Sequence, residues 1–60
     1  MAKTSVITGK WHVWMVDKGV LLSNEETKQL RDFKDVDSVV NWLYIYGEKE
    51  SARVVNNTLK

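Results

Sequence analysis

The chain has 60 residues with no cysteine and no proline, and its nine Lys or Arg against eight Asp or Glu give a formal net charge of +1. This length allows a single domain, residues 1–60, and excludes disulfides, while structural zinc is disfavoured because His12 is the only imidazole in a sequence without thiols. No apolar run approaches the ~18 residues of a membrane span, and no signal-peptide apolar block follows the first residues, so we expect a cytoplasmic protein without membrane contact.

The first half of the chain predicts a β-hairpin. Residues 1–9 form a polar start, which is either a flexible arm or a short edge strand. Residues 10–16 are the clearest strand, because aromatic and β-branched side chains suit a pleated sheet. Residues 17–19 (Asp-Lys-Gly) predict a hairpin turn, and residues 20–23 predict the returning strand.

Residues 24–34 fit two structures. Ser23 followed by Glu26 matches a helix capping box, but the apolar stripe of that helix would be thin. A strand over residues 27–33 contains poor strand formers, but it would complete a three-stranded meander, which is more stable than a lone hairpin. We therefore prefer the strand.

Residues 36–46 are the strongest predicted helix. Asp35 or Asp37 can cap its N-terminus, and Gly47 can end it. Its apolar side chains recur at helical spacing, at Val36, Val39, Val40, Leu43 and Tyr46. Residues 48–59 predict a second helix, so the short connection makes an αα-hairpin. The fold class is therefore α+β: a β-hairpin or three-stranded antiparallel meander followed by two short helices.

The strand over residues 10–16 has large side chains on both faces. With a period of two, Trp11 and Met15 point to one face, whereas His12 and Trp14 point to the other. A sheet covered by helices on one face normally alternates apolar and polar residues. The simpler explanation is that the N-terminal arm folds across the second face or that one Trp is partly exposed, and the alternative is that a partner chain or a ligand covers this face.

The helix over residues 36–46 shows a similar surplus. On a helical wheel Ile45 lies away from the main apolar face, and Trp42 lies at its edge. Contact with the second helix or the sheet is the simpler explanation for Trp42, whereas Ile45 favours association with another protein. A homodimer would account for both surpluses and would stabilise a small domain that lacks disulfides and metal.

Nothing in the sequence predicts catalysis. It has one histidine, no phosphate-binding glycine loop and no recognisable nucleophile with its base. A domain of this size also has little room for a ligand pocket of ~300 Å³ or more. We therefore expect no enzyme, no metal, no cofactor and no small-molecule substrate.

The first functional hypothesis is a small interaction module or accessory factor that binds another protein, as a homodimer. Interface cores are enriched in aromatic side chains, and the charge near zero fits a protein partner. The expected partner or dimer contacts are Trp11, Trp14, Trp42 and Ile45.

The alternative is a nucleic-acid-binding regulator. Lys10, Trp11, His12 and Trp14 place cations beside aromatic rings on one strand, as in platforms that stack single-stranded bases. The last helix offers a second polar surface. The candidate nucleic-acid contacts are Lys10, His12, Lys49, Arg53, Asn56, Asn57 and Lys60. Glu48 would repel phosphates, so a protein partner ranks first.

Overall fold

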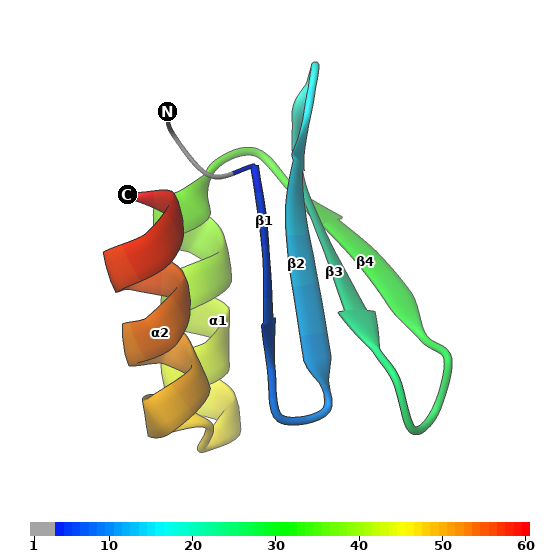
Figure 1. Cartoon of the computed structure of the whole chain (residues 1–60), viewed down its shortest axis with the longest axis vertical. Coiled ribbons are helices and arrows are strands. Elements are labelled where there is room, and N and C mark those ends of the chain that lie inside the picture. The colour runs from blue at the N-terminus through cyan, green and yellow to red at the C-terminus, as the bar shows by residue number, and fades with distance from the viewer. Residues whose placement is uncertain (1–3) are drawn as a thin grey trace.

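The computed structural model describes residues 4–60, which form a four-stranded antiparallel sheet followed by two helices (Figure 1). The elements are β1 (Ser5–Thr8), β2 (Trp11–Val16), β3 (Gly19–Asn24), β4 (Leu30–Phe33), α1 (Val36–Tyr46) and α2 (Lys49–Leu59). The strand order is β1-β2-β3-β4, so every strand pairs with its neighbour in sequence. The predicted α+β class is confirmed, with four strands where the sequence predicted two or three.

The additional strand is β1, which forms one edge of the sheet. It pairs antiparallel with β2, with Ser5 opposite Trp14 and Thr8 opposite Trp11. Of the two alternatives for residues 1–9, the edge strand is therefore correct at residues 5–8, and residues 1–3 lie outside the described part. Because β1 lies beside β2, it does not cover the second face of β2.

The segment between β3 and β4 is a turn built on Asn24. The Asn24 side-chain oxygen Oδ1 accepts hydrogen bonds from the backbone N–H groups of Glu26 and Thr27, at 2.9 and 3.2 Å. The backbone then reverses, and the Asn24 N–H donates to the Gln29 carbonyl at 2.9 Å. The strand interpretation of residues 24–34 is confirmed over β4, and the helix alternative is wrong because this turn folds the backbone back onto β3.

Gly19 allows the start of β3 to lie close to the end of β4. Its φ is 153°, and a Cβ built there would overlap the carbonyl oxygen of Phe33. Only glycine combines this backbone conformation with so close an approach. The predicted turn residue therefore also permits the close approach of β3 to the end of β4.

Both ends of α1 are those predicted from the sequence. The Ser38 N–H donates a hydrogen bond of 2.8 Å to Oδ1 of Asp35, the N-cap residue. This backbone hydrogen bond lowers the pKa of Asp35 below its usual value. Gly47 ends the helix with a left-handed φ of 95°, and the Glu48 N–H donates to the Leu43 carbonyl at 2.8 Å. Such a cap satisfies carbonyls that the helix itself leaves free.

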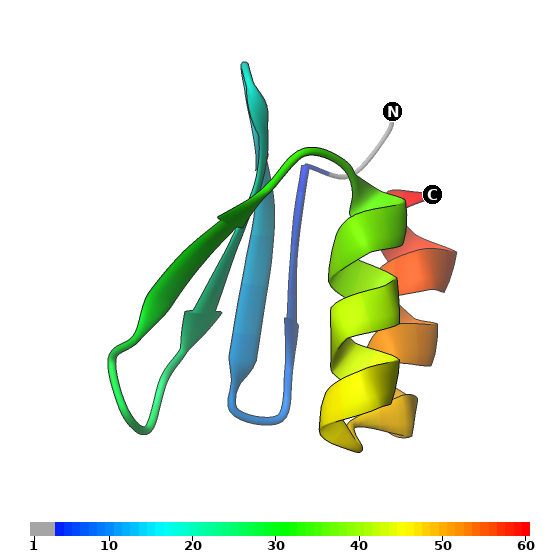
Figure 2. The ribbon, with the colours of Figure 1, turned by 180° about the vertical axis from the view of Figure 1, so that it is seen from behind.

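The two helices pack side by side on one face of the sheet (Figure 2). The α2 helix lies against β1, whereas α1 lies against β3 and β4. The buried core between the layers consists of Trp11, Val13, Val20, Leu22, Val36, Val39, Leu43, Ala52 and Val55. Within residues 4–60, no element covers the opposite face of the sheet.

Candidate functional site

The uncovered side of the sheet is the first candidate site, and we call it the open face. Successive side chains of a strand point to opposite sides, so the residues between the core positions point away from the helices. The open face consists of Ser5, Ile7, His12, Trp14, Leu21, Ser23, Leu30 and Asp32.

The strand register arranges the open face in two rows across the sheet. One row runs Ile7, His12, Ser23 and Leu30, and the other runs Ser5, Trp14, Leu21 and Asp32. Ile7 and Leu30 lie at opposite edges and are 66% and 60% exposed. Trp14 and Leu21 are half-buried opposite each other on the two central strands. Each of the four strands therefore contributes one apolar side chain to the open face, and polar residues lie beside them in each row.

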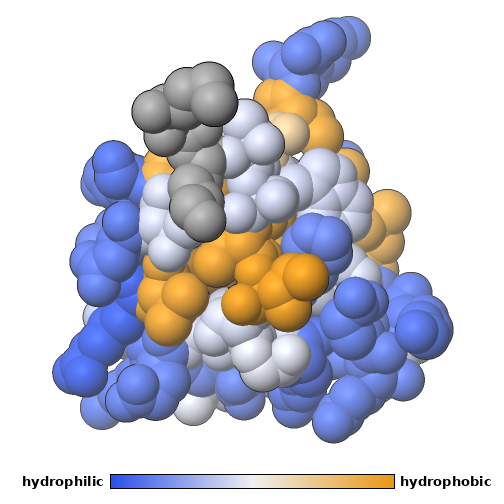
Figure 3. Space-filling view, in the orientation of Figure 1, coloured by the Kyte–Doolittle hydropathy of each residue, from blue (hydrophilic) through white to orange (hydrophobic). Residues whose placement is uncertain are grey.

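His12 and Trp14 contact each other on the open face. Their ring centroids are 4.7 Å apart, with the planes tilted by 54°. Both residues are half-buried, and each also has cross-strand neighbours on β1 and β3. The space-filling view looks onto the β1 edge of the sheet, beside the open face, and shows apolar residues in the middle of this side with hydrophilic residues to the left and lower right (Figure 3).

The open face has almost no charge. Asp32 is its only member with a formal charge when His12 is neutral, and no Lys or Arg belongs to it. Nucleic-acid binding depends on cations that neutralise phosphates. The chemistry of this face therefore suits an apolar protein surface better than a phosphate backbone.

The strand residues of the nucleic-acid hypothesis do not form one platform. Trp11 points into the core, whereas His12 and Trp14 lie on the open face. Lys10 accompanies Trp11, with Nζ 5.6 Å from the ring centroid. Because successive side chains of β2 point to opposite sides, Trp11 is separated from His12 and Trp14. The prediction that these residues together form one base-stacking platform is therefore wrong.

The expected interface residues lie in three separate places. Trp14 is on the open face, whereas Ile45 is 78% exposed on α1, which lies on the other side of the sheet, so a single interface through the open face leaves Ile45 out. Trp11 is only 3% exposed, and its Nε1 donates a hydrogen bond of 3.0 Å to Glu48 Oε2. So little exposed surface cannot anchor a partner, and Trp11 is a core residue instead.

Trp42 belongs to an aromatic cluster within the molecule. Its ring centroid is 5.6 Å from that of Trp11 in a T-shaped contact and 4.7 Å from that of Tyr46 in a stacked one. Contact with the sheet and with its own helix therefore accounts for this half-buried residue, as the simpler explanation expected.

The polar residues of the last helix form an exposed stripe. Residues spaced three or four apart share one side of a helix, and here they are Lys49, Arg53, Asn56 and Lys60, with Asn57 beside them. Two of the three cations contact carboxylates: Arg53 lies 3.9 Å from Glu50, and Lys60 contacts Asp37. These pairs reduce the positive charge that the stripe presents.

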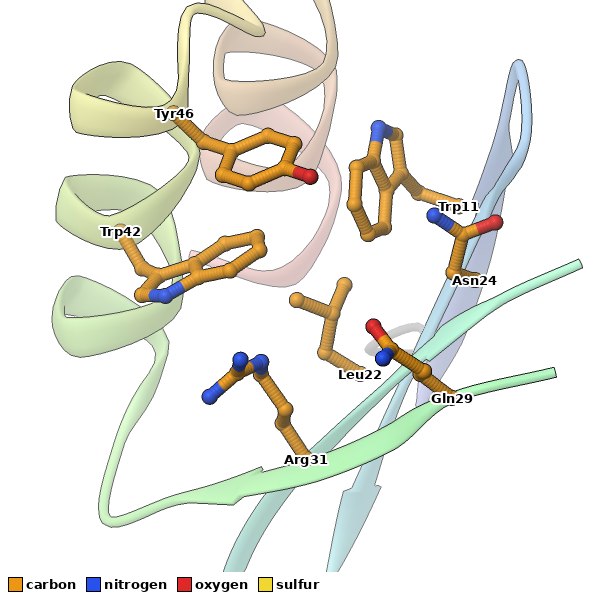
Figure 4. Close-up of a pocket in the computed structure, with 7 residues that line it drawn as sticks. All are labelled: Trp11, Leu22, Asn24, Gln29, Arg31, Trp42 and Tyr46. Carbon is orange, nitrogen blue, oxygen red and sulfur yellow. The ribbon is translucent and has the colours of Figure 1, made fainter. Parts of the chain in front are cut away.

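Sequence reasoning missed a pocket beside the aromatic cluster. Its lining residues are Trp11, Leu22, Asn24, Gln29, Arg31, Trp42 and Tyr46 (Figure 4). Gln29 and Arg31 were missed because they lie in the ambiguous segment, where only the register of β4 shows that Arg31 faces the helices. Sequence reasoning also missed Ile7 and Leu30, because no signal fixed the strands that carry them.

No protein family, curated protein or solved structure matches this sequence. Within residues 4–60 no helix is both long and apolar enough to cross a membrane. In the same range no group of three or more His, Asp or Glu side chains could hold a metal ion. Function is therefore inferred from the open face, the α2 stripe and the pocket.

Proposed function

We propose that the protein is a non-enzymatic interaction module that binds another protein and acts as a homodimer, with two copies packed open face to open face. The observation that carries this proposal is the apolar surface on the side of the sheet away from the helices. Ile7, Trp14, Leu21 and Leu30 all contribute to it.

Face-to-face packing suits the chemistry of this surface. Two antiparallel sheets pack ~10 Å apart through interdigitating side chains, and a two-fold axis brings the same patch of each copy together. The open face buries at most one formal charge per copy, Asp32, which lies on the edge strand β4 and can stay in contact with water. Association would therefore bury apolar surface at little electrostatic cost.

The area of the open face predicts a weak dimer. Four strands ~4.8 Å apart, each four to six residues long at ~3.3 Å per residue, give a face of roughly 19 by 16 Å. Allowing for side-chain relief, two copies would bury on the order of 1,000 Å² in total, near the lower limit for a specific interface. We therefore expect dissociation in the micromolar range.

Sedimentation of two matched variants tests the dimer. Leu30→Glu and Ile45→Glu each add one carboxylate at an exposed apolar position, so neither should unfold the monomer. We expect the wild-type mass to rise with concentration across the micromolar range, Leu30→Glu to shift dissociation at least tenfold towards monomer, and Ile45→Glu to behave as wild type. A monomeric wild type at millimolar concentration, or equal effects of the two variants, would contradict the assignment.

Nucleic-acid binding is the second candidate, and one observation favours it: the alignment of Lys49, Arg53, Asn56 and Lys60 on one exposed side of α2. Fluorescence anisotropy with labelled single-stranded and duplex DNA at low salt tests it. If the stripe binds phosphates, Lys49→Glu should weaken binding severalfold, whereas Lys18→Glu in the β2–β3 turn should not, and added salt should weaken binding steeply. The protein-binding proposal predicts no saturable binding.

The expected cytoplasmic location remains a prediction, and fractionation of cells that express the tagged protein tests it.

A further inference from the structure

The pocket lies on the helix side of the sheet, between the end of β3, β4 and the C-terminal half of α1 (Figure 4). Its volume is about 30 Å³, whereas sites for drug-sized ligands have ~300 Å³ or more. A water molecule needs about 10–15 Å³ of such space. The pocket can therefore hold only a small chemical group, such as the end of an amino-acid side chain.

Asn24 supplies a hydrogen-bond donor to this pocket. The residue is 8% exposed, and its Oδ1 is occupied by the backbone N–H groups of Glu26 and Thr27. Because both of these partners are donors, the amide orientation is fixed with Nδ2 on the other side, towards Trp11 and the pocket. Within residues 4–60 no acceptor bonds to Nδ2. Both of its N–H groups are therefore available to a ligand.

Arg31 supplies the charge. Opposite Leu22 in the register, it faces the helices, and its guanidinium carbon lies 5.2 Å from the ring centroid of Trp42. No carboxylate of the described residues pairs with it. The cation–π contact holds the guanidinium beside the pocket and leaves N–H groups free for an acceptor.

The remaining walls are the rings of Trp11, Trp42 and Tyr46, the Leu22 side chain and the amide of Gln29. Trp11 lies T-shaped to Trp42 and Tyr46, at centroid distances of 5.6 and 5.8 Å, and Leu22 is fully buried beneath them. A charge-assisted hydrogen bond is stronger beside such apolar walls than in open water. The walls therefore favour an anion that carries an apolar stem.

The charged residues next to the pocket, Glu48 and Lys10, have opposite signs, so Arg31 provides the net charge. The Glu48 carboxylate bonds to the indole of Trp11, and Lys10 lies over the same ring at 5.6 Å. Among the lining residues themselves, Arg31 is the only charged one. The lining thus combines the Arg31 cation, the unfilled amide donor of Asn24 and the Gln29 amide with aromatic and aliphatic side chains.

We propose that this pocket binds a carboxylate of a partner polypeptide. Arg31 donates hydrogen bonds to the carboxylate oxygens from beside Trp42, Asn24 Nδ2 supplies a further donor on the Trp11 side of the pocket, and the adjoining methylene packs against Leu22 (Figure 4). The carboxylate belongs to an Asp or Glu residue of the partner or to the partner's own C-terminus. This site lies on the helix side of the sheet, so it does not depend on what covers the open face.

Nuclear magnetic resonance of the full ¹⁵N-labelled protein tests the proposal with three N-acetylated peptides of otherwise equal sequence. One contains Glu and has an amidated C-terminus, one contains Gln and has a free C-terminus, and one contains Gln and is amidated. We expect at least one carboxylate peptide to shift the indole signals of Trp11 and Trp42 and the side-chain amide of Asn24, saturably and in the millimolar range. The peptide without a carboxylate should leave them unchanged, and the stronger of the two acids identifies the source.

Three variants distinguish specific binding in the pocket from a nonspecific attraction between the peptide and the charge of the protein. Asn24→Asp keeps the oxygen that holds the turn and replaces the free donor by an acceptor, so it should lower the affinity at least tenfold. Arg31→Gln changes an exposed residue, leaves the fold intact and should have the same effect. Arg53→Gln, which removes an equal charge from α2, should bind as wild type.

Two results would overturn the proposal: no saturable shift with any carboxylate peptide, or equal binding by the wild type and Arg31→Gln. Sedimentation tests dimerisation through the open face, whereas the nuclear magnetic resonance signals test carboxylate binding in the pocket. Either proposal can therefore fail without the other.

Discussion

Trp11 joins the sheet to both helices. Its ring contacts Trp42 and Tyr46 on α1, and its Nε1 bonds to Glu48 just before α2. The sequence identifies Trp11 as an important contact residue. It cannot show whether Trp11 packs in the core or at an interface with a partner, because β2 has aromatic side chains on both sides. The decision between the two sides depends on where the helices pack.

Trp11→Ala should unfold the protein, whereas Trp14→Ala should not. Removing a buried Trp costs about 3–5 kcal/mol, and a domain of this size has only about that much stability. Trp14 is half-buried on the open face, and we expect its loss to cost the monomer about 1 kcal/mol. Urea unfolding followed by circular dichroism at low protein concentration checks both, and similar losses for the two variants would contradict the assignment of faces.

At the scale of elements, the sequence predicts best where the signals are local. The limits of α1 follow from Asp35 and Gly47, because a cap acts within one turn of its own helix. The strand β4 is ambiguous in sequence, because the turn before it depends on hydrogen bonds that Asn24 makes once β3 is in place. The edge strand β1 is ambiguous for a similar reason, since its backbone pairing with β2 leaves little trace in the pattern of side chains.

The α1 cap predicts a pH dependence. The Ser38 backbone hydrogen bond lowers the pKa of Asp35 below its usual 3.8. A lowered folded-state pKa means that the stabilisation is present above the unfolded pKa and is lost as pH falls through the folded one. At pH 7 we expect Asp35→Ala to lower the Tm by roughly 4–8 °C.

The difference between Asp35→Ala and the wild type should shrink as the pH falls below 3.8, the usual pKa of this carboxyl. The control is Asp35→Asn, which keeps an acceptor that does not titrate, so its Tm should stay close to that of the wild type at pH 7. Thermal unfolding of the three proteins across acidic pH gives the comparison, and a gap that persists unchanged at pH 2 would show that the carboxylate is not the cap.

At the scale of the whole molecule, the open face is only partly predictable. The sequence shows that β2 has large side chains on both sides, which identifies Trp14 and His12. Their neighbours Leu21 and Leu30 join them only through the strand register, which sequence periodicity leaves free. The pocket is out of reach of the sequence, because its lining residues come from three strands, a turn and a helix and share no motif.

A protein with no cysteine and a single histidine has few means to stabilise so small a core. The two-layer fold buries one side of its sheet and leaves the four apolar side chains of the open face uncovered. The same surface that limits the stability of the monomer can therefore be buried in a dimer. The lack of disulfides is thus consistent with the proposed dimerisation.

Isotope-filtered nuclear Overhauser spectroscopy on a mixture of ¹³C-labelled and unlabelled protein tests the central claim most directly, at a concentration where sedimentation shows association. We predict contacts between copies that join the ring of Trp14 to the methyl groups of Leu21 or Leu30, and no such contacts at Ile45. Contacts between copies confined to Ile45 and its neighbours on α1, or none at all at millimolar concentration, would contradict it.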